Sequence, residues 1–234
     1  MFLSVIIPTF NEEKVIASTL KKVLAYLHQQ DYQWEVIVAD DASTDRTVSQ
    51  TSLFDVQVIT SQTNQGKGGA IRNGFRIAQG RWLLFLDADY STTMDELDNF
   101  WPSSTDHDII IASRAVPGAR ITQPQPWYKV ALGRLGNRVI QLFLLPGLSD
   151  TQCGFKLYRR EVLPLFEKLQ NLRWSFDFEV LFLARQHNFR ILELPVNWTN
   201  NHDSAVQPLD YFSTLLQALV IRYSYLRNKW LKKH

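Results

Sequence analysis

The sequence predicts an α/β protein with a mostly parallel central sheet flanked by helices. Short apolar runs rich in β-branched residues alternate with amphipathic helical stretches through residues 3–86, which is the pattern of consecutive βαβ units. Length and composition agree, because 234 residues with 45% hydrophobic and 21% charged side chains are enough for a globular core without cross-links. Polar or acidic clusters follow three of the predicted strands, where α/β proteins bind ligands.

The first part of the chain contains four predicted strands. Residues 3–8 form an apolar run stopped by a proline, as expected of a buried strand. Helices are expected from Asn11 to about His28, where apolar residues recur at helical spacing, and from the glycine-rich segment 64–69 to about Gly80. The four strands are predicted at residues 3–8, 34–39, 56–60 and 81–86.

The second part has a looser pattern of strands at residues 109–112 and 190–196 and helices at residues 127–145, 176–187 and 209–230. No repeat or clear linker interrupts the chain, so residues 1–208 are predicted to form one domain. Residues 209–234 are predicted to be a basic amphipathic helix. This helix either belongs to the same domain or serves as a membrane-interface or oligomer element.

The formal net charge of +2 hides an asymmetry along the chain. Residues 1–111 carry 8 Lys and Arg against 15 Asp and Glu, a net charge of −7. Residues 112–149 carry +5 and residues 209–234 carry +4, while residues 150–208 are neutral. The acidic part suits a cation, and the basic segments suit a phosphate group or a membrane surface. No nucleic-acid-binding motif is present, so nucleic acid is not an expected partner.

Cysteine usage and hydropathy predict a cytoplasmic protein, peripheral to the cytoplasmic face of a membrane through its basic amphipathic helices. Cys153 is the only cysteine, which excludes an internal disulfide and fits a reducing compartment. The first ten residues lack the basic segment and cleavage site of a signal peptide. Stretches without Asp, Glu, Lys or Arg reach only eleven residues. A spanning helix needs about 20 apolar residues, so no transmembrane helix is expected.

The sharpest chemical feature is Asp87-Ala88-Asp89, which directly follows the fourth predicted strand. One carboxylate of such a pair can bind a divalent cation, and the other can accept a hydrogen bond from a sugar hydroxyl. Oxygen ligands favour Mg²⁺ or Mn²⁺, whose shell a diphosphate would complete. An isolated Asp-x-Asp more often caps a helix. Clusters at residues 11–12 and 40–41 end other predicted strands, however, and favour a shared site.

The remaining polar residues are less specific. Asp41 is placed to accept a hydrogen bond from a base or ribose. Lys67 lies in a glycine-rich segment that does not match a phosphate-binding loop, and the approach of an anion and plain turn chemistry are equally good interpretations. Cys153 is expected to be a small buried thiol. The five histidines lack zinc spacing, so carboxylates are the expected ligands of any metal.

Several motifs occur in a fixed order: IIPTFNEE at residues 6–13, VADDASTD at 38–45, NQGKGGA at 64–70 and LDAD at 86–89. Together they resemble glycosyltransferase family 2, which implies the GT-A fold and a nucleotide-sugar donor. The second half adds SR at 113–114, SDTQCGFK at 149–156 and RWSFDFE at 173–179. These resemble the polyprenyl-phosphate glycosyltransferases, the dolichyl-phosphate β-glucosyltransferase branch more than the mannosyltransferase branch. The resemblance spans roughly residues 3–200.

The resemblance also implies roles for the matching residues. The nucleotide-sugar would be bound by Pro8, Phe10, Asn11, Glu12, Ala39, Asp41, Lys67, Asp87 and Ala88. Asp89 would hold the Mg²⁺ or Mn²⁺, and Asp150 would border the reaction centre as the second catalytic residue. The acceptor phosphate would be held by Arg114, Arg134 and Asn137.

Two positions depart from the family pattern. Phe10 stands where a tyrosine is usual, which keeps stacking but removes a hydroxyl. Residues 200–204 lack the expected Gly-Ser-Lys, so the sequence offers no lysine at the place of a late phosphate-binding lysine.

The predicted function is inverting transfer of a hexose, glucose from UDP-glucose first, to a polyprenyl (dolichyl or undecaprenyl) phosphate. The phosphate oxygen is already anionic, so positioning and stabilisation of the leaving diphosphate matter more than a strong base. One alternative within the family is GDP-mannose as the donor or a non-lipid acceptor. Another, of a different class, is a nucleotide-binding module without catalysis. Self-association through the C-terminal helix is also left open.

Overall fold

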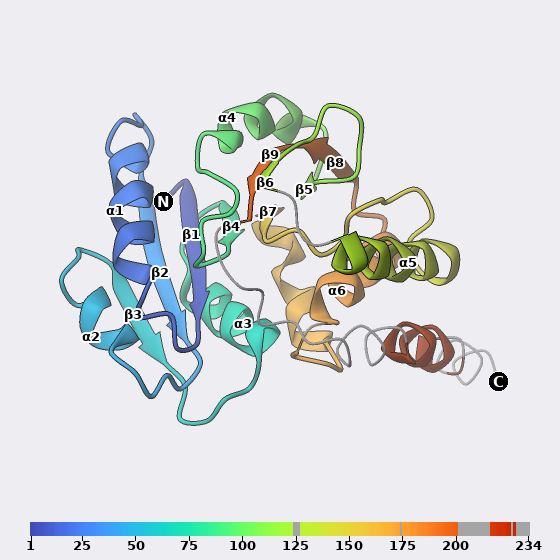
Figure 1. Cartoon of the computed structure of the whole chain (residues 1–234), viewed down its shortest axis with the longest axis horizontal. Helices are drawn as coiled ribbons and strands as arrows, with labels where there is room; N and C mark the ends of the chain where they lie inside the picture. Colours follow the sequence, from blue (N-terminus) through green and yellow to red (C-terminus); the bar gives the residue numbers. More distant parts are fainter. Residues whose placement is uncertain (124–126, 174, 201–215, 226, 228–234) are drawn as a thin grey trace.

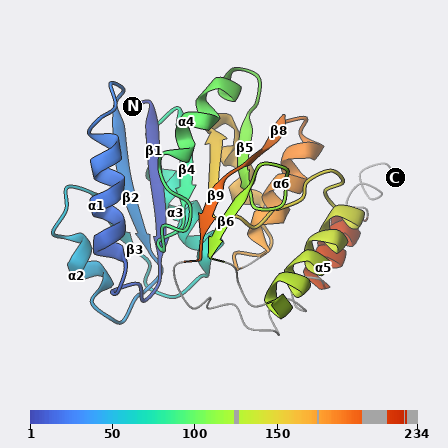
Figure 2. The same ribbon diagram turned by 45° about the horizontal axis from the view of Figure 1, so that its top comes forward.

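The structure is a computed structural model that describes residues 1–123, 127–173, 175–200, 216–225 and 227. For residues 127–130, 132 and 134 only the backbone is described. The chain forms a central sheet with helices on both faces, and a helix at 216–225 lies beside α5 (Trp127–Phe143) in both views (Figures 1 and 2).

Seven of the described strands form the central sheet, in the order β3-β2-β1-β4-β7-β5-β8, and β6 pairs with β9 beside it. All the pairs in the central sheet are parallel except those of β7, which runs antiparallel to β4 and β5. The predicted mostly parallel sheet is therefore confirmed. In chain order the strands are β1 (Leu3–Thr9), β2 (Trp34–Asp40), β3 (Gln57–Thr60), β4 (Trp82–Leu86), β5 (Ile109–Ser113), β6 (Arg120–Gln123), β7 (Phe155–Arg159), β8 (Ile191–Pro195) and β9 (Asn197–Thr199).

The two faces of the sheet bury separate apolar clusters because successive residues of a strand point to opposite sides. In β1, Val5 and Ile7 pack with α1 (Ile16–Leu27) and α4 (Glu96–Phe100), whereas Ile6 packs with α3 (Lys67–Ile77). The α3 side also holds α6 (Phe176–Gln186) and the 3₁₀ helix η2 (Arg160–Lys168). The remaining short helices are α2 (Thr47–Thr51) and the 3₁₀ helix η1 (Trp101–Thr105).

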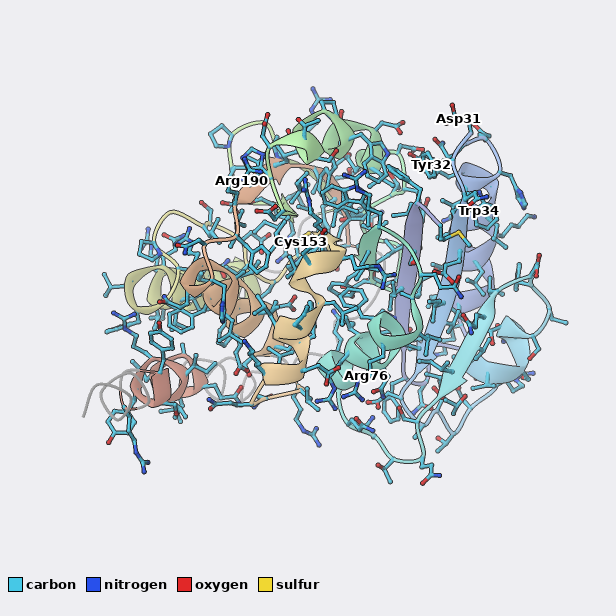
Figure 3. The ribbon with its side chains drawn as sticks, turned by 180° about the vertical axis from the view of Figure 1, so that it is seen from behind. Asp31, Tyr32, Trp34, Arg76, Cys153 and Arg190 are labelled. Carbon is cyan, nitrogen blue, oxygen red and sulfur yellow. The ribbon has the colours of Figure 1, made fainter. Side chains whose placement is uncertain are left out.

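Aromatic side chains close the amino edge of the sheet. Phe2 contacts both Tyr32 and Trp101, with ring centroids 5.0 and 5.2 Å apart. Tyr32 precedes β2 and Trp34 begins it, so both lie at the amino end of this strand (Figure 3). The amino edge therefore carries this aromatic cluster, and the polar clusters lie at the opposite edge, where the parallel strands end.

The elements correct the sequence prediction in two places, and a third prediction is tested only in part. The first helix begins at Ile16 and not at Asn11, because Asn11 adopts a left-handed backbone with φ 57°. Strands β6, β7 and β9 were not predicted. Of the helix expected at residues 209–230, the structure describes 216–225 and 227 as helical, and the rest lies outside the described residues.

Gly74 lets α3 approach β1 closely, and this contact can be tested by substitution. A Cβ at Gly74 would lie 2.7 Å from the Cγ2 of Ile6, a fully buried side chain. We expect Gly74→Ala to lower the free energy of unfolding by about 1–3 kcal/mol in urea denaturation, because the helix must move away from the sheet. The matched control is Gly136→Ala in α5, where no described atom lies within 4 Å of the added Cβ. Equal stability of the two variants would contradict this packing role.

Candidate active site

The polar clusters predicted at the strand ends meet at one edge of the sheet. Residues 10–12 follow β1, Asp41 follows β2 and residues 87–89 follow β4, and these three strands are parallel neighbours. Because β7 is antiparallel, its beginning lies at the same edge, where Phe155 pairs with Leu86. The segment before β7 therefore joins the site from the opposite chain direction.

Asp87 is held by β7 and by α3. Its backbone N–H donates to the carbonyl of Gly154 at 2.9 Å, and its Oδ1 lies 2.6 Å from the Nζ of Lys67. A Cβ at position 154 would come within 1.8 Å of Asp87 Oδ2, so only glycine leaves room for this carboxylate. Lys67 was predicted to bind the nucleotide-sugar, and in this structure its ammonium pairs with Asp87.

Glu12, Asp87 and Asp89 form a concentrated negative group. The pKa of Glu12 is raised to about 7, first by burial and then by repulsion from Asp89 and Asp87, while Lys67 lowers it by a smaller amount. Burial and Asp87 likewise raise the pKa of Asp89, whose Oδ1 accepts a hydrogen bond from the Ser91 amide at 2.9 Å. Carboxylates that repel one another in this way are stabilised by a divalent cation.

The acidic group fits a Mg²⁺ or Mn²⁺ ion that takes part of its shell from a ligand. Within the described residues, no three His, Cys, Asp or Glu side chains are arranged to hold a metal ion by themselves. One or two protein carboxylates with the phosphate oxygens of a nucleotide are a common shell for Mg²⁺. The role of Asp89 as a ligand of this ion stays a prediction.

The loops after β1 and β2 are tied together by hydrogen bonds. The Asn11 amide donates to Ser43 Oγ at 2.9 Å, and its side-chain Oδ1 accepts from the Thr44 amide at 2.9 Å. Asp41 is buried and accepts from the backbone N–H groups of Gln65 and Gly66 at 2.9 and 2.7 Å. Its observed contacts therefore hold the segment before α3, and its predicted contact with a base or ribose stays a prediction.

The first backbone N–H groups of α3 already have a protein acceptor. Gly68 and Gly69 both donate to the carbonyl of Leu172, at 2.7 and 3.2 Å. For these two amides the structure supports the turn interpretation and not an anion site. A Cβ at Gly68 would lie 2.7 Å from Phe176, so this glycine also permits close packing between α3 and α6.

The residues predicted to line the nucleotide pocket differ in exposure. Phe10 is 47% exposed at the end of β1 and offers an aromatic face, whereas Pro8, Ala39 and Ala88 are buried. Ala39 also lines a cavity of about 270 Å³ between β2, β3 and α3, together with Asp40, Thr60, Ser61 and Gln65. Phe10 is therefore the surface on which a base could stack.

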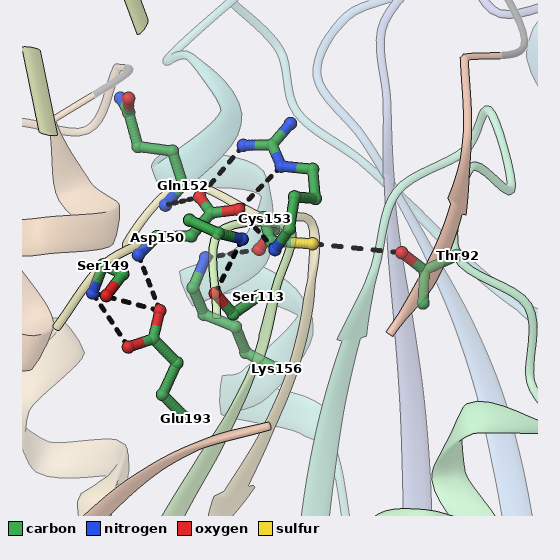
Figure 4. A network of polar contacts seen from close by, with 10 residues as sticks. Thr92, Ser113, Ser149, Asp150, Gln152, Cys153, Lys156 and Glu193 are labelled. Carbon is green, nitrogen blue, oxygen red and sulfur yellow. Dashed lines mark hydrogen bonds and ion pairs between the residues drawn. The ribbon is translucent and has the colours of Figure 1, made fainter. Parts of the chain in front are cut away.

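Arg114, at the end of β5, is clamped by Asp150 (Figure 4). Asp150 Oδ2 accepts from the Arg114 backbone N–H at 3.0 Å and from Nε at 2.7 Å, and Oδ1 accepts from Nη2 at 2.9 Å. The guanidinium also lies over the ring of Trp198, with Cζ 5.4 Å from the centroid. A guanidinium held on two sides in this way has a fixed orientation, from which its remaining N–H groups can donate hydrogen bonds to an anion.

Asp150 is poorly suited to act as a base. Burial alone would raise its pKa, but Arg114 and Lys156 outweigh this and hold the pKa below its ordinary value. Its two oxygens accept four hydrogen bonds, including one from the Gln152 amide at 3.3 Å. The geometry therefore favours an orienting role for Asp150 over proton abstraction.

The two other predicted acceptor-site residues lie on α5. The side chain of Arg134 is outside the described residues. Asn137 has a buried Oδ1 with no hydrogen-bond partner among the described residues. The structure thus brings Arg114 and Asp150 together and places Asn137 on the helix that the sequence predicted.

Sequence reasoning missed three residues that hold the site. Glu193 on β8 accepts from the Ser149 and Asp150 amides, at 2.8 and 2.6 Å, and so fixes the turn that carries Asp150 (Figure 4). Lys156 on β7 and Asp177 on α6 form a buried ion pair. The available signal was the placement of charged residues inside otherwise apolar segments, FKLY and SFDF.

Comparison with known proteins decides the family. The sequence profile of glycosyl transferase family 2 matches residues 4–166. The chain belongs to glycosyl transferase family 2. It is therefore a glycosyltransferase, and the predicted family and enzyme class are confirmed.

Two relatives of this glycosyltransferase are dolichyl-phosphate beta-glucosyltransferases. That of Drosophila melanogaster is 36% identical over 226 residues, covering 88% of this chain and 69% of the relative. That of Homo sapiens is 32% identical over 251 residues, covering 97% of this chain and 77% of the relative.

A solved structure has the same fold. Glucosyl-3-phosphoglycerate synthase from Mycobacterium tuberculosis, crystallised with Mn²⁺, UDP and glucosyl-3-phosphoglycerate, superposes with a TM-score of 0.70 at 18% identity. The match covers 94% of this chain and 79% of that one. The predicted GT-A architecture is confirmed. Separately, no helix within the described residues is both long and apolar enough to cross a bilayer.

The raised pKa of Glu12 predicts a pH-dependent stability. The pKa of Glu12 is 4.5 ordinarily and about 7 in the folded protein. At pH values between these two, the carboxyl group is deprotonated in the unfolded chain and still protonated in the folded protein. The free energy of unfolding therefore falls as pH rises through this window. We expect Glu12→Gln to unfold with a free energy about 1–3 kcal/mol higher than wild type at pH 8, and equal to it near pH 4, in urea titrations without metal. A gain of the same size at both pH values would contradict the assignment.

Proposed function

We propose that this glycosyltransferase moves glucose from UDP-glucose to a polyprenyl phosphate, dolichyl or undecaprenyl, with inversion at the anomeric carbon. The observation that carries the proposal is that an acidic group and a guanidinium group lie at the same edge of the sheet. Glu12, Asp87 and Asp89 form an acidic group suited to a cation and a diphosphate, and Arg114 with Asp150 forms a fixed cationic fork. Burial alone would lower the pKa of Arg114, but Asp150, then Cys153 and Asp87, outweigh burial and raise this pKa, so the two groups act on each other. The similarity to dolichyl-phosphate beta-glucosyltransferases supports the choice of sugar and acceptor.

On the donor side, each contact has a stated task. Phe10 stacks on the base, and Asp87 orients the ribose or sugar through a hydrogen bond. Asp89 holds Mg²⁺ or Mn²⁺, which, when bound, neutralises charge on the leaving diphosphate. Lys67, paired with Asp87, limits the excess negative charge at this carboxylate.

On the acceptor side, Arg114 receives the phosphate. A lipid phosphate is anionic at neutral pH, so its oxygen attacks the anomeric carbon without losing a proton to the enzyme. The protein must place this oxygen in line with the leaving group, and a clamped guanidinium does so with little loss of side-chain entropy. Asp150 acts by holding Arg114, with Asn137 and Arg134 on α5 as further acceptor contacts.

Transfer of labelled glucose into an organic-extractable product tests the proposal. Wild type should form this product from UDP-glucose and a polyprenyl phosphate only with Mg²⁺ or Mn²⁺. Asp89→Ala should lower kcat/KM at least a hundredfold, because the leaving diphosphate loses its counter-charge. Asp95→Ala, at an exposed aspartate next to α4, is the control and should keep wild-type turnover.

Other outcomes would redirect the proposal. Product from GDP-mannose alone would replace the donor. Metal-dependent nucleotide binding without product from either donor would favour a non-lipid acceptor. If no acceptor of any class supported turnover, a catalytically silent nucleotide-binding module would remain, and full turnover by Asp89→Ala would refute the metal assignment.

We also propose that the enzyme works on the cytoplasmic face of an anionic membrane through α5 and the neighbouring helix at 216–225. Large apolar side chains on these helices are exposed, and basic residues accompany them. Such a surface binds the interface of anionic lipid bilayers. The exposed apolar residues are Leu135, Leu142, Phe143, Leu216, Leu219, Val220 and Tyr223, and the exposed basic ones are Arg138, Arg222 and Arg227.

Part of the second helix also packs on the domain. Ala218 and Ile221 are buried, and Tyr225 Oη donates to Gln186 Oε1 of α6 at 2.7 Å. The membrane surface therefore lies on a helix that is anchored to the catalytic domain on its other side.

Vesicle co-sedimentation tests the membrane surface. Leu142→Ser with Leu219→Ser should reduce binding to vesicles containing phosphatidylserine about tenfold, because two exposed apolar contacts are lost. Leu53→Ser, also at an exposed leucine (79%) but in α2's trailing turn, should leave binding unchanged. Unchanged vesicle binding by the double variant would contradict the proposal. If that variant instead dissociated a dimer in gel filtration, the surface would be a self-association site.

A further inference from the structure

Two fully buried charges lie beneath the donor site and have no task in the proposed mechanism. Lys156 on β7 is 0% exposed, and Asp177 in the first turn of α6 is 3% exposed. The Lys156 Nζ pairs with Asp177 Oδ1 and donates to the carbonyl of Cys153 at 2.7 Å. Removing two charges from water is costly, and hydrophobic residues of similar volume often replace such pairs without loss of stability. The pair therefore calls for a reason besides stability.

The charges of the pair interact with those of Lys67 and Asp87. The Lys156 Nζ lies 5.4 Å and the Lys67 Nζ 4.9 Å from the centroid of the same ring, Phe85. Burial alone would lower the pKa of Lys67, but Asp87 and then Asp177 outweigh it and raise this pKa. Burial raises the pKa of Asp177, while Lys156 and then Lys67 lower it. The four charges alternate in sign, as Lys156, Asp177, Lys67 and Asp87.

The segment that leads into β7, the strand of Lys156, also contacts Asp87 directly. Gly154, two residues before Lys156, accepts the hydrogen bond of the Asp87 amide and leaves the space that its carboxylate fills. The Lys156 ammonium in turn holds the Cys153 carbonyl, next to Gly154. A displacement of Lys156 would therefore change the position of Asp87 through the backbone of Cys153 and Gly154, as well as through the interactions between the charges.

We propose that the buried Lys156–Asp177 pair is a positioning element for the donor site, which holds Lys67 and Asp87 in the arrangement that accepts the cation-bound nucleotide. Asp177 supplies the second negative charge beside Lys67, so that this ammonium stays between Asp87 and Asp177. Lys156 compensates Asp177 and fixes the turn at Cys153 and Gly154. The inference builds on the proposed donor side of the reaction and is independent of the acceptor.

The test removes both charges and keeps the polar packing. Lys156→Gln with Asp177→Asn replaces the ion pair by two neutral amides of similar size, so that neither charge is left buried and unpaired. We expect the double variant to fold, with a cooperative thermal transition. Calorimetry should show binding of UDP with Mn²⁺ about tenfold weaker than in wild type. In the transfer assay KM for UDP-glucose should rise about as much, with KM for the polyprenyl phosphate unchanged.

Tyr158→Phe is the matched control. Tyr158 lies two residues from Lys156 on the same strand, is fully buried, and its hydroxyl has no hydrogen-bond partner among the described residues. This variant should bind UDP with Mn²⁺ as wild type does. A general loosening of β7 would weaken binding in both variants, whereas the proposed role affects only the charge-removing one.

A double-mutant cycle shows whether the pair acts through Lys67. In a Lys67→Met background, removing the Lys156–Asp177 charges should weaken UDP binding less than twofold further, because the element that they position is already lost. A folded double variant with wild-type affinity for UDP and Mn²⁺ would overturn the proposal, as would fully additive losses in the cycle. Absence of any lipid product from wild type would refute the proposed acceptor and leave this binding test intact. If wild type bound GDP and not UDP, the same measurements would be made with GDP.

Discussion

The active site depends on the insertion of one antiparallel strand, β7, between β4 and β5. A purely parallel sheet would bring only strand ends to the carboxyl edge. β7 begins at that edge, so the segment of residues 149–154 enters it from the opposite direction. This segment carries Asp150, which clamps Arg114, and Gly154, which receives the Asp87 carboxylate. The segment that leads into this one strand thereby holds both Asp87, proposed for the donor side, and Arg114, proposed for the acceptor side.

Charge compensation in a buried environment is the second principle of the site. Asp150 with Arg114, Asp177 with Lys156 and Asp87 with Lys67 are three ion pairs near one edge of the sheet, and in the Lys156–Asp177 pair both partners are buried. Each partner offsets part of the desolvation penalty of the other. Glu12 and Asp89 carry raised pKa values at the same edge, in the part of the site that we assign to a divalent cation. The local charge thus separates the acidic group, proposed to hold the cation, from the Arg114 guanidinium, proposed to hold the acceptor phosphate.

Much of the fold could be predicted from the sequence because four of its strands, β1 to β4, and two of its helices, α1 and α3, are marked by local patterns. The strands at β1, β2, β3 and β4 are short apolar runs, and the helices between them carry apolar residues at helical spacing. β7 was missed because Lys156, the second residue of the strand, interrupts the apolar pattern although it is fully buried. β6 and β9 are strands of four and three residues whose pairing joins distant segments, which local periodicity does not report.

The sequence by itself determined the family, the α/β architecture and the acidic residues at the strand ends. Motifs in a fixed order indicate the family, and local patterns of apolar and acidic residues indicate the other two. Only the tertiary structure decided what those residues contact. Asp41 holds a backbone segment, Leu172 occupies the amides at the start of α3, and Glu193 fixes the turn that bears Asp150. The physical reason is that hydrogen bonds and ion pairs between residues far apart in the chain depend on distance and burial in the folded state. Neither quantity follows from spacing along the sequence.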